Sequence, residues 1–241
     1  MYHSLFMNLK DATALVTGGS SGIGLAIARV LADSGSRVAI TGRDQGRLSA
    51  AAKEIGAHGI KADVSNEGDV TRTYREFFQK FDHLDILVNS AGFGLRAPLI
   101  EMDRAKFEAV FQTNVTGTML MSREAAKHFI ERKSGNIINL GSTAALRGAP
   151  NGTAYYASKF AVRGMTECWR AELRQHNIRV FLINPSEVLT NFATNAGFSQ
   201  DDDNPTKLQA EDIAHVVRAA LEMHDRGFTT ELTVFATNPK D

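Results

Sequence analysis

The chain has 241 residues, of which 43% are hydrophobic and 22% are charged. These values are those of an ordinary globular chain that can bury a large core, and they predict one domain over residues 1–241. Lysine plus arginine and aspartate plus glutamate are equal at 27 each, which argues against a nucleic-acid partner.

The single cysteine, Cys168, excludes an internal disulfide and a zinc site built from several cysteines. We expect it to be a small buried apolar residue in a reducing compartment. No apolar run approaches the length of a membrane span, so we expect a cytoplasmic protein without a membrane partner. Because Met7 is itself a plausible start, residues 1–6 are expected to be a loose extension.

Short apolar runs rich in β-branched residues alternate with longer segments of helical periodicity. The short runs predict seven strands, at residues 13–17, 37–41, 59–63, 84–89, 135–140, 178–183 and 231–235. The longer segments predict helices at residues 22–34, 45–55, 66–81, 104–133, 155–176 and 210–223. This alternation predicts an α/β fold with a doubly wound parallel sheet and helices on both faces.

A glycine-rich turn, TGGSSGIG at residues 17–24, follows the first predicted strand and opens the first helix. Glycines at 18, 22 and 24 allow a sharp turn, a close approach of the backbone to a pyrophosphate, and close packing of helix on strand. The helix N-terminal N–H groups would then face the anion. Gly18, Ser20, Ser21 and Gly22 are therefore candidate nucleotide contacts.

The same turn allows a second interpretation, because Gly18, Ser20 and Gly22 also form G-x-S-x-G, the nucleophile elbow of α/β-hydrolases. Ser20 would then be a nucleophile. The elbow normally follows several strands, whereas this turn follows the first, and the pattern leaves Gly24 unexplained. A serine hydrolase is the less favoured alternative.

Four further motifs follow the turn in order: NSAG at 89–92, TNV at 113–115, NLGS at 139–142 and YYASK at 155–159. With the turn, they make the chain resemble the short-chain dehydrogenase/reductase family over nearly its whole length, in particular 3-oxoacyl-carrier-protein reductases. The resemblance implies a single Rossmann-type domain and hydride transfer between a nicotinamide nucleotide and a carbonyl/alcohol pair.

The resemblance also decides between two adjacent tyrosines. Tyr155 and Lys159 match the Tyr-x-x-x-Lys pattern of the family, one helical turn apart. Spacing alone leaves both tyrosines open, since Tyr156 and Lys159 are also neighbours on a helix. Tyr155 is thus implied as the general acid of reduction and the general base of oxidation. We expect Tyr156 to serve packing or substrate contact.

A lysine beside a phenol should lower the phenol's pKa from its ordinary value of about 10. At ~4 Å and an effective dielectric constant of ~20, the attraction is at most about 4 kcal/mol before desolvation is subtracted. We expect the positive charge of an oxidised nicotinamide to act in the same direction.

Two more catalytic residues are carried over by the resemblance. Ser142 ends the fifth predicted strand, where its hydroxyl would hydrogen-bond the substrate oxygen. Asn114 matches an asparagine that holds a water beside the lysine in a proton relay, and a purely structural hydrogen bond is the alternative for it. The dispersed histidines predict no metal site.

Further nucleotide contacts are implied along the chain, with Tyr155 and Lys159 among the residues that touch the nucleotide. Asn89 is equally well explained as a structural tie between strands. The segment at 184–190 resembles the family's P-G-x-V-x-T, but Ser186 replaces the glycine. The remaining implied contacts are Ile23, Asp63, Val64, Ala91, Gly92, Pro185, Val188 and Thr190.

The end of the second strand indicates which nucleotide is used. An NAD enzyme of this fold usually has a carboxylate there for the ribose 2′-hydroxyl, and this chain has Gly42 followed by Arg43. Arg43 is suited to a 2′-phosphate, so we expect NADP rather than NAD. Asp44 would be the ribose ligand if the strand ended two residues later.

Residues 186–206 show little periodicity and are expected to form a substrate loop or lid. Apolar residues on loops near the site favour a partly apolar small-molecule carbonyl or alcohol. We expect helices 104–133 and 155–176 to pair with symmetry mates in a homodimer or homotetramer. A Rossmann-type protein that senses nucleotide without turnover is the alternative from another functional class.

Overall fold

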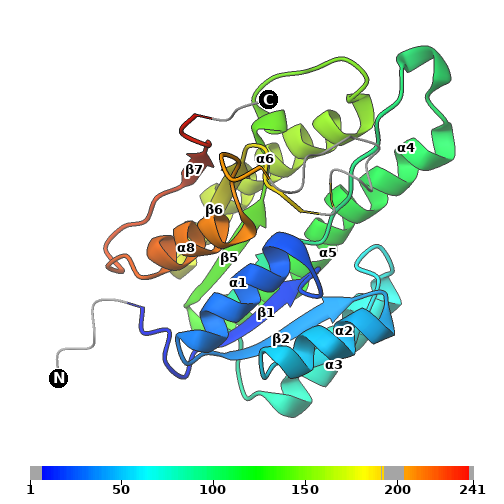
Figure 1. The fold of residues 1–241 in the computed structure, drawn as a ribbon. Helices are drawn as coiled ribbons and strands as arrows, with labels where there is room; N and C mark the ends of the chain where they lie inside the picture. The colour runs from blue at the N-terminus through cyan, green and yellow to red at the C-terminus, as the bar shows by residue number, and fades with distance from the viewer. Residues whose placement is uncertain (1–6, 191, 193–203, 239–241) are drawn as a thin grey trace.

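A computed structural model describes residues 7–190, 192 and 204–238, and its centre is a seven-stranded parallel sheet (Figure 1). The strand order is β3-β2-β1-β4-β5-β6-β7, which confirms the predicted doubly wound sheet. The expected extension at 1–6, and residues 191 and 193–203 of the expected lid, lie outside the described residues. The strands are β1 (Thr13–Thr17), β2 (Arg37–Gly42), β3 (His58–Lys61), β4 (Ile86–Asn89), β5 (Gly135–Leu140), β6 (Ile178–Pro185) and β7 (Glu231–Val234).

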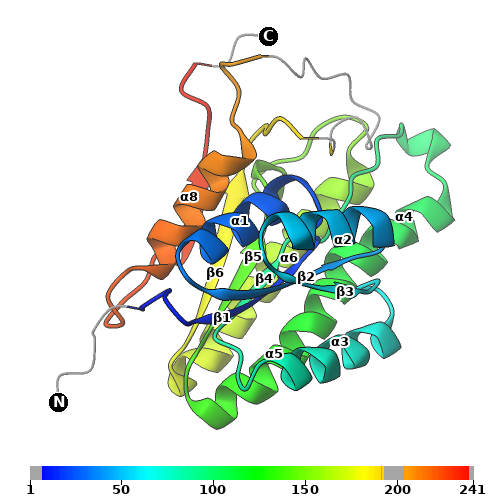
Figure 2. The same cartoon turned by 60° about the horizontal axis from the view of Figure 1, so that its bottom comes forward.

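Helices cover both faces of the sheet (Figure 2). Alternate strand residues pack in the cores on opposite faces. On β1, Val16 packs in the core beneath α1, α2 and α8, whereas Leu15 packs in the core beneath α3, α5 and α6. The helices are α1 (Gly22–Asp33), α2 (Gln45–Glu54), α3 (Glu67–Lys80), α4 (Arg104–Phe111), α5 (Thr118–Arg132), α6 (Thr153–Leu173) and α8 (Ala210–Leu221).

The predicted helix at 104–133 is interrupted by a π-helical segment, Gln112–Gly117, between α4 and α5. Two contacts accompany the wider turn. The buried Asn114 side chain bonds both backbone groups of Phe93, and Gly117 lies against Val64 so closely that a Cβ there would be 2.6 Å from Val64 Cγ2. Such π-helical turns are frequent at functional sites, and this one carries Asn114.

Two other expectations about helices need correction. Helix α6 begins at Thr153, two residues earlier than predicted. Cys168 is exposed rather than buried, because it lies on the face of α6 that turns away from the sheet. The buried residues of α6 are Ala154, Ser158, Lys159, Val162, Thr166 and Leu173. None of the helices formed by the described residues is long and apolar enough to span a bilayer.

The order of the strands reverses at β1, which lies between β2 and β4. Connections leave in opposite directions on either side of this point, and in open sheets of this kind ligands bind beyond the carboxyl ends of the strands there. The turn after β1, the segment after β4 and the end of β5 all lie at this edge. The predicted motifs are therefore brought to one end of the sheet.

Candidate active site

The glycine-rich turn adopts the conformation that its sequence predicts. Gly18 and Gly22 have φ angles of +64° and +53°, in the left-handed region that glycine occupies without strain. A Cβ on Gly18 would lie 2.8 Å from Ala91 Cα, so the backbones of the two segments touch. The Thr17 hydroxyl accepts hydrogen bonds from the N–H groups of Ser90 and Ala91, both at 3.1 Å, and holds the two segments together.

Helix α1 begins without a side-chain cap at Ser21, whereas Asp44, Asn66 and Asp103 cap α2, α3 and α4. Its first N–H groups consequently remain available to an anion at this edge. Thr190 lies above the turn, with its Cγ2 3.5 Å from the position of a Cβ on Gly22. These features fit the pyrophosphate of a dinucleotide. Ile23 packs its side chain on the core, which leaves only its backbone to the turn.

Ser142, Tyr155 and Lys159 converge at the carboxyl end of β5. The buried Lys159 amine donates a 2.7 Å hydrogen bond to the Leu140 carbonyl and lies 5.7 Å from the centre of the Tyr155 ring. Ser142 lies close enough to the Tyr155 hydroxyl to lower the pKa of the phenol, and its own hydroxyl oxygen accepts the Ala144 N–H at 3.1 Å. The ring of Phe192 packs on the other side of Tyr155, at 5.3 Å between centroids.

Asn114 lies behind this group. Its amide donates to the Phe93 carbonyl and the Ser158 hydroxyl, and its oxygen accepts from the Phe93 N–H, each at 3.0 Å. The structural hydrogen bonds considered as an alternative are thus present. Gly92 runs past both Asn114 and Lys159, since a Cβ there would be 3.0 Å from Asn114 Oδ1 and 4.0 Å from Lys159 Nζ.

The two titratable groups have pKa values displaced in opposite directions. Burial raises the pKa of the Tyr155 phenol to about 12, against a smaller lowering by the nearby Ser142 side chain. Burial lowers the pKa of the Lys159 amine to about 8. The expected lowering of the phenol's pKa by Lys159 is therefore wrong for the protein alone. Desolvation of the phenolate dominates, and the amine is directed at Leu140.

Comparison with known proteins agrees with this arrangement. The short chain dehydrogenase family matches residues 12–201. The chain is 34% identical over 234 residues to an uncharacterized oxidoreductase of Staphylococcus saprophyticus, covering 95% of this chain and 98% of that protein. The chain belongs to the short-chain dehydrogenase family. Members of this family are oxidoreductases that use NAD(P)H.

Solved structures of the family superimpose over almost the whole chain. A 3-ketoacyl-(acyl-carrier-protein) reductase from Brucella melitensis, complexed with NADH, is 31% identical with a TM-score of 0.88, over 95% of this chain and 98% of that chain. A metagenomic short-chain oxidoreductase in complex with NADP is 32% identical with a TM-score of 0.84, over 96% of this chain and 100% of that chain.

The residues after β2 and β3 lie at the same edge of the sheet. Arg43 is exposed directly after β2, and Asp44 is the N-cap of α2, accepting from Arg47 N–H at 2.8 Å. That hydrogen bond lowers the pKa of the Asp44 carboxyl. After β3, the Asp63 carboxylate accepts from both the N–H and the hydroxyl of Ser65, and Val64 is buried against Gly117.

Asn89 forms the structural tie that was considered for it. Its amide donates to Ser122 at 2.8 Å and to Asn139 at 2.9 Å, and Asn139 donates in turn to Thr166. Beyond β6, the Ser186 N–H donates to the Val234 carbonyl at 2.9 Å. Ser186 has no left-handed φ, so a serine at the position of the family's glycine causes no backbone strain. Pro185 ends β6, and Val188 bridges to Leu208.

Sequence reasoning missed two polar residues at this edge. The Thr17 hydroxyl accepts hydrogen bonds from the segment at 89–92, and the Asn184 side-chain oxygen accepts the N–H of Ser142 at 3.2 Å. Both are buried polar residues at the ends of apolar strands. A polar residue at the end of an apolar strand could have indicated these contacts, because a buried polar group needs a hydrogen-bond partner.

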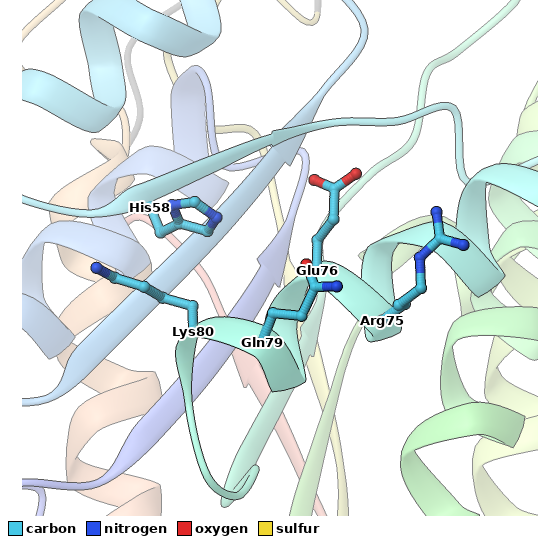
Figure 3. Close-up of a pocket in the computed structure, with 5 residues that line it drawn as sticks. All are labelled: His58, Arg75, Glu76, Gln79 and Lys80. Atoms are coloured by element: carbon cyan, nitrogen blue, oxygen red, sulfur yellow. The ribbon is translucent and has the colours of Figure 1, made fainter.

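Other features do not join the site. Ser20 lies against Gly42 at the end of β2, and no hydrogen bond joins it to a histidine in the described part of the chain. A surface groove lined by His58, Arg75, Glu76, Gln79 and Lys80 lies at the start of β3 and the end of α3, the opposite edge of the sheet (Figure 3). No group of three potential metal ligands occurs among the described residues.

The pKa of Lys159 predicts a pH dependence of stability. A lysine in the unfolded chain titrates near 10.5, so between pH 8 and 10.5 the unfolded state binds more protons. The stability of the wild type relative to Lys159→Met should therefore rise with pH, by at most about 1.4 kcal/mol per pH unit. Urea unfolding at pH 7.5 to 9.5 measures this, with Lys61→Met as the control for loss of an exposed lysine. A difference that is flat or falls with pH would contradict the burial of the amine.

Proposed function

We propose that the protein transfers a hydride between NADP(H) and a carbonyl or alcohol substrate. The observation that carries this proposal is the convergence of Ser142, Tyr155 and Lys159 beside a glycine turn that fits a pyrophosphate. When bound, the nicotinamide supplies or accepts the hydride.

In the direction of reduction, the Ser142 hydroxyl binds the carbonyl oxygen of the substrate and Tyr155 donates a proton to it. Lys159 serves as the cation of the site and, with its pKa of about 8, can return a proton at neutral pH. Asn114 lies within the same buried group and supports the lysine side of the relay. Each of these roles is assigned to the residue that matches the corresponding motif of the family.

The nearby apolar side chains favour a partly apolar substrate. Phe192 packs on the ring of Tyr155, and Leu146 is exposed at the edge of the loop after Ser142. Phe93 is held by Asn114, and Leu95 follows on the same loop. We infer a small-molecule ketone, aldehyde or corresponding alcohol.

The choice of NADP rests on Arg43, since solved relatives contain NADP in one case and NADH in another. Strand β2 ends at Gly42, which makes Arg43 the first side chain beyond the strand. Asp44, the competing ribose ligand, is occupied as the N-cap of α2 and lies 3.8 Å from Arg47 Nε. Arg43 forms no ion pair within the described residues and so is free to meet a 2′-phosphate.

Replacing Tyr155 by phenylalanine tests the proton transfer. We expect Tyr155→Phe to lower kcat by roughly 10² to 10⁴, as for loss of a general acid, with little change in nucleotide affinity. NADPH oxidation should be followed with ketones, aldehydes, quinones and 3-oxoacyl thioesters. Tyr156→Phe is the matched control and should be mild, because the Tyr156 ring packs against Gly152 at the start of α6. An equal loss of kcat from both changes would refute the assignment. Tight nucleotide binding without turnover of any substrate would favour a protein that senses nucleotide without catalysis.

A second pair of variants tests the nucleotide preference. Arg43→Ala should raise KM for NADPH and leave KM for NADH nearly unchanged, because only NADPH carries the 2′-phosphate. Arg47→Ala removes a nearby exposed arginine that already pairs with Asp44, and should preserve the preference. The ratio of kcat/KM for the two nucleotides is the measurement. A wild-type preference for NADH would contradict the role of Arg43.

We also infer a homodimer or homotetramer in which α5 and α6 meet their symmetry mates. Ile130 on α5 and Phe160 on α6 are exposed at 38% and 46%, which supports an apolar interface there. Light scattering at micromolar concentration should give a multiple of 26.3 kDa, and Phe160→Glu should reduce it. A wild-type monomer with full activity would defeat this proposal. Separately from the oligomeric state, we infer a cytoplasmic location.

A further inference from the structure

Asn184 is a fully buried residue near the end of β6, and both ends of its amide are engaged. Its oxygen accepts the backbone N–H of Ser142 at 3.2 Å, and its nitrogen donates to Glu231 Oε1 at 2.7 Å. An ionised carboxylate accepts hydrogen bonds and donates none. Glu231 therefore fixes the orientation of the amide, with the oxygen of Asn184 directed at Ser142.

This contact lies where β5 leaves the sheet. Gly141 still donates its N–H to the Ile183 carbonyl at 2.8 Å, but Ser142 begins a 3-10 turn over Thr143–Ala145. The N–H of Ser142 is bound by the side chain of Asn184 instead of a strand carbonyl. A Cβ on Gly141 would overlap the Asn184 oxygen, so the chain before Ser142 packs directly on this amide.

The second oxygen of Glu231 reaches the helix that carries Tyr155. Glu231 Oε2 lies 3.4 Å from an Nη of Arg163, which is one helical turn beyond Lys159 on α6. Arg170, farther along α6, donates to the Thr230 carbonyl at 2.7 Å and fixes the adjoining residue. One carboxylate thus connects the backbone of Ser142, through Asn184, to the helix of Tyr155 and Lys159.

We propose that Asn184 and Glu231 are positioning residues that hold the Ser142 hydroxyl at the Tyr155 phenol. The inference rests on the proposed function, because it assigns Ser142 to the substrate oxygen. Neither residue contacts the reacting atoms. Their effect on the rate arises because an error of about 1 Å at Ser142 costs a large factor in catalysis.

A double-mutant cycle between Asn184 and Ser142 tests this role. The substrates are NADPH and whichever carbonyl compound of the panel named above the wild type reduces fastest. Asn184→Ala should lower kcat by about tenfold or more and leave the Kd of NADPH within about twofold. In the Ser142→Ala background the same change should have almost no effect on kcat, because it acts only through Ser142. Hydrogen exchange should show faster exchange of the Ser142 amide in Asn184→Ala.

Two further variants keep the test decisive if Asn184→Ala folds poorly. Glu231→Gln retains an oxygen for the Asn184 amide and should keep most of kcat, whereas Glu231→Leu should lose it as Asn184→Ala does. Asn136→Ala, which removes a buried asparagine at the amino end of β5, should lower stability without lowering kcat.

The outcomes separate the two levels of the proposal. If Ser142→Ala is severely impaired and Asn184→Ala keeps the wild-type kcat, the positioning role is wrong while the proposed function stands. Equal losses from Asn184→Ala in both backgrounds would also overturn it. A wild-type rate in Ser142→Ala would refute the proposed role of Ser142 and this inference with it.

Discussion

The hydrogen bond from Lys159 to the Leu140 carbonyl joins the first turns of α6 to the end of β5. At 2.7 Å and in a buried setting, it directs the amine and fixes the height of the helix against the sheet. Tyr155 lies one turn before this anchor and Ser142 lies two residues beyond Leu140. The relative positions of the phenol and the hydroxyl consequently depend on this contact, on the ladder between β5 and β6, and on the hydrogen bond of Asn184 with Ser142.

The burial of Lys159 and Tyr155 in this geometry disfavours the charged form of each side chain. Desolvation lowers the pKa of Lys159 to about 8 and raises the pKa of Tyr155 to about 12. In the protein alone the phenol is therefore a weak acid at neutral pH. A site of this kind becomes suited to proton transfer when a positive charge and the substrate oxygen are added, so nucleotide binding and proton transfer should be coupled.

Much of the fold could be predicted from the sequence because strands and helices carry distinct apolar periods. The parallel sheet and the turn at 17–24 follow from such local patterns. The π-helical segment at 112–117 could not be predicted, since the contacts of Asn114 with Phe93 and of Gly117 with Val64 join segments far apart in sequence. The exposure of Cys168 was missed because residue type alone does not say which face of α6 meets the sheet.

The candidate site shows the same division. Family motifs selected Tyr155 over Tyr156, a choice that helical spacing left open. The dual engagement of Asn184 by Ser142 and Glu231 depends on the neighbouring ends of β5, β6 and β7, and no local pattern encodes that contact. The pKa of Tyr155 was predicted in the wrong direction, because the degree of burial of the phenol is a property of the packed structure.

Transfer of a labelled hydride tests the central claim most directly. The protein should be incubated with NADPH deuterated at the transferring position of C4 and with the carbonyl panel, and the products analysed by mass spectrometry and NMR. The account predicts one deuterium on the carbinol carbon of the product for each nucleotide oxidised. A product without deuterium at that carbon, or bound NADPH that no carbonyl compound oxidises, would contradict it.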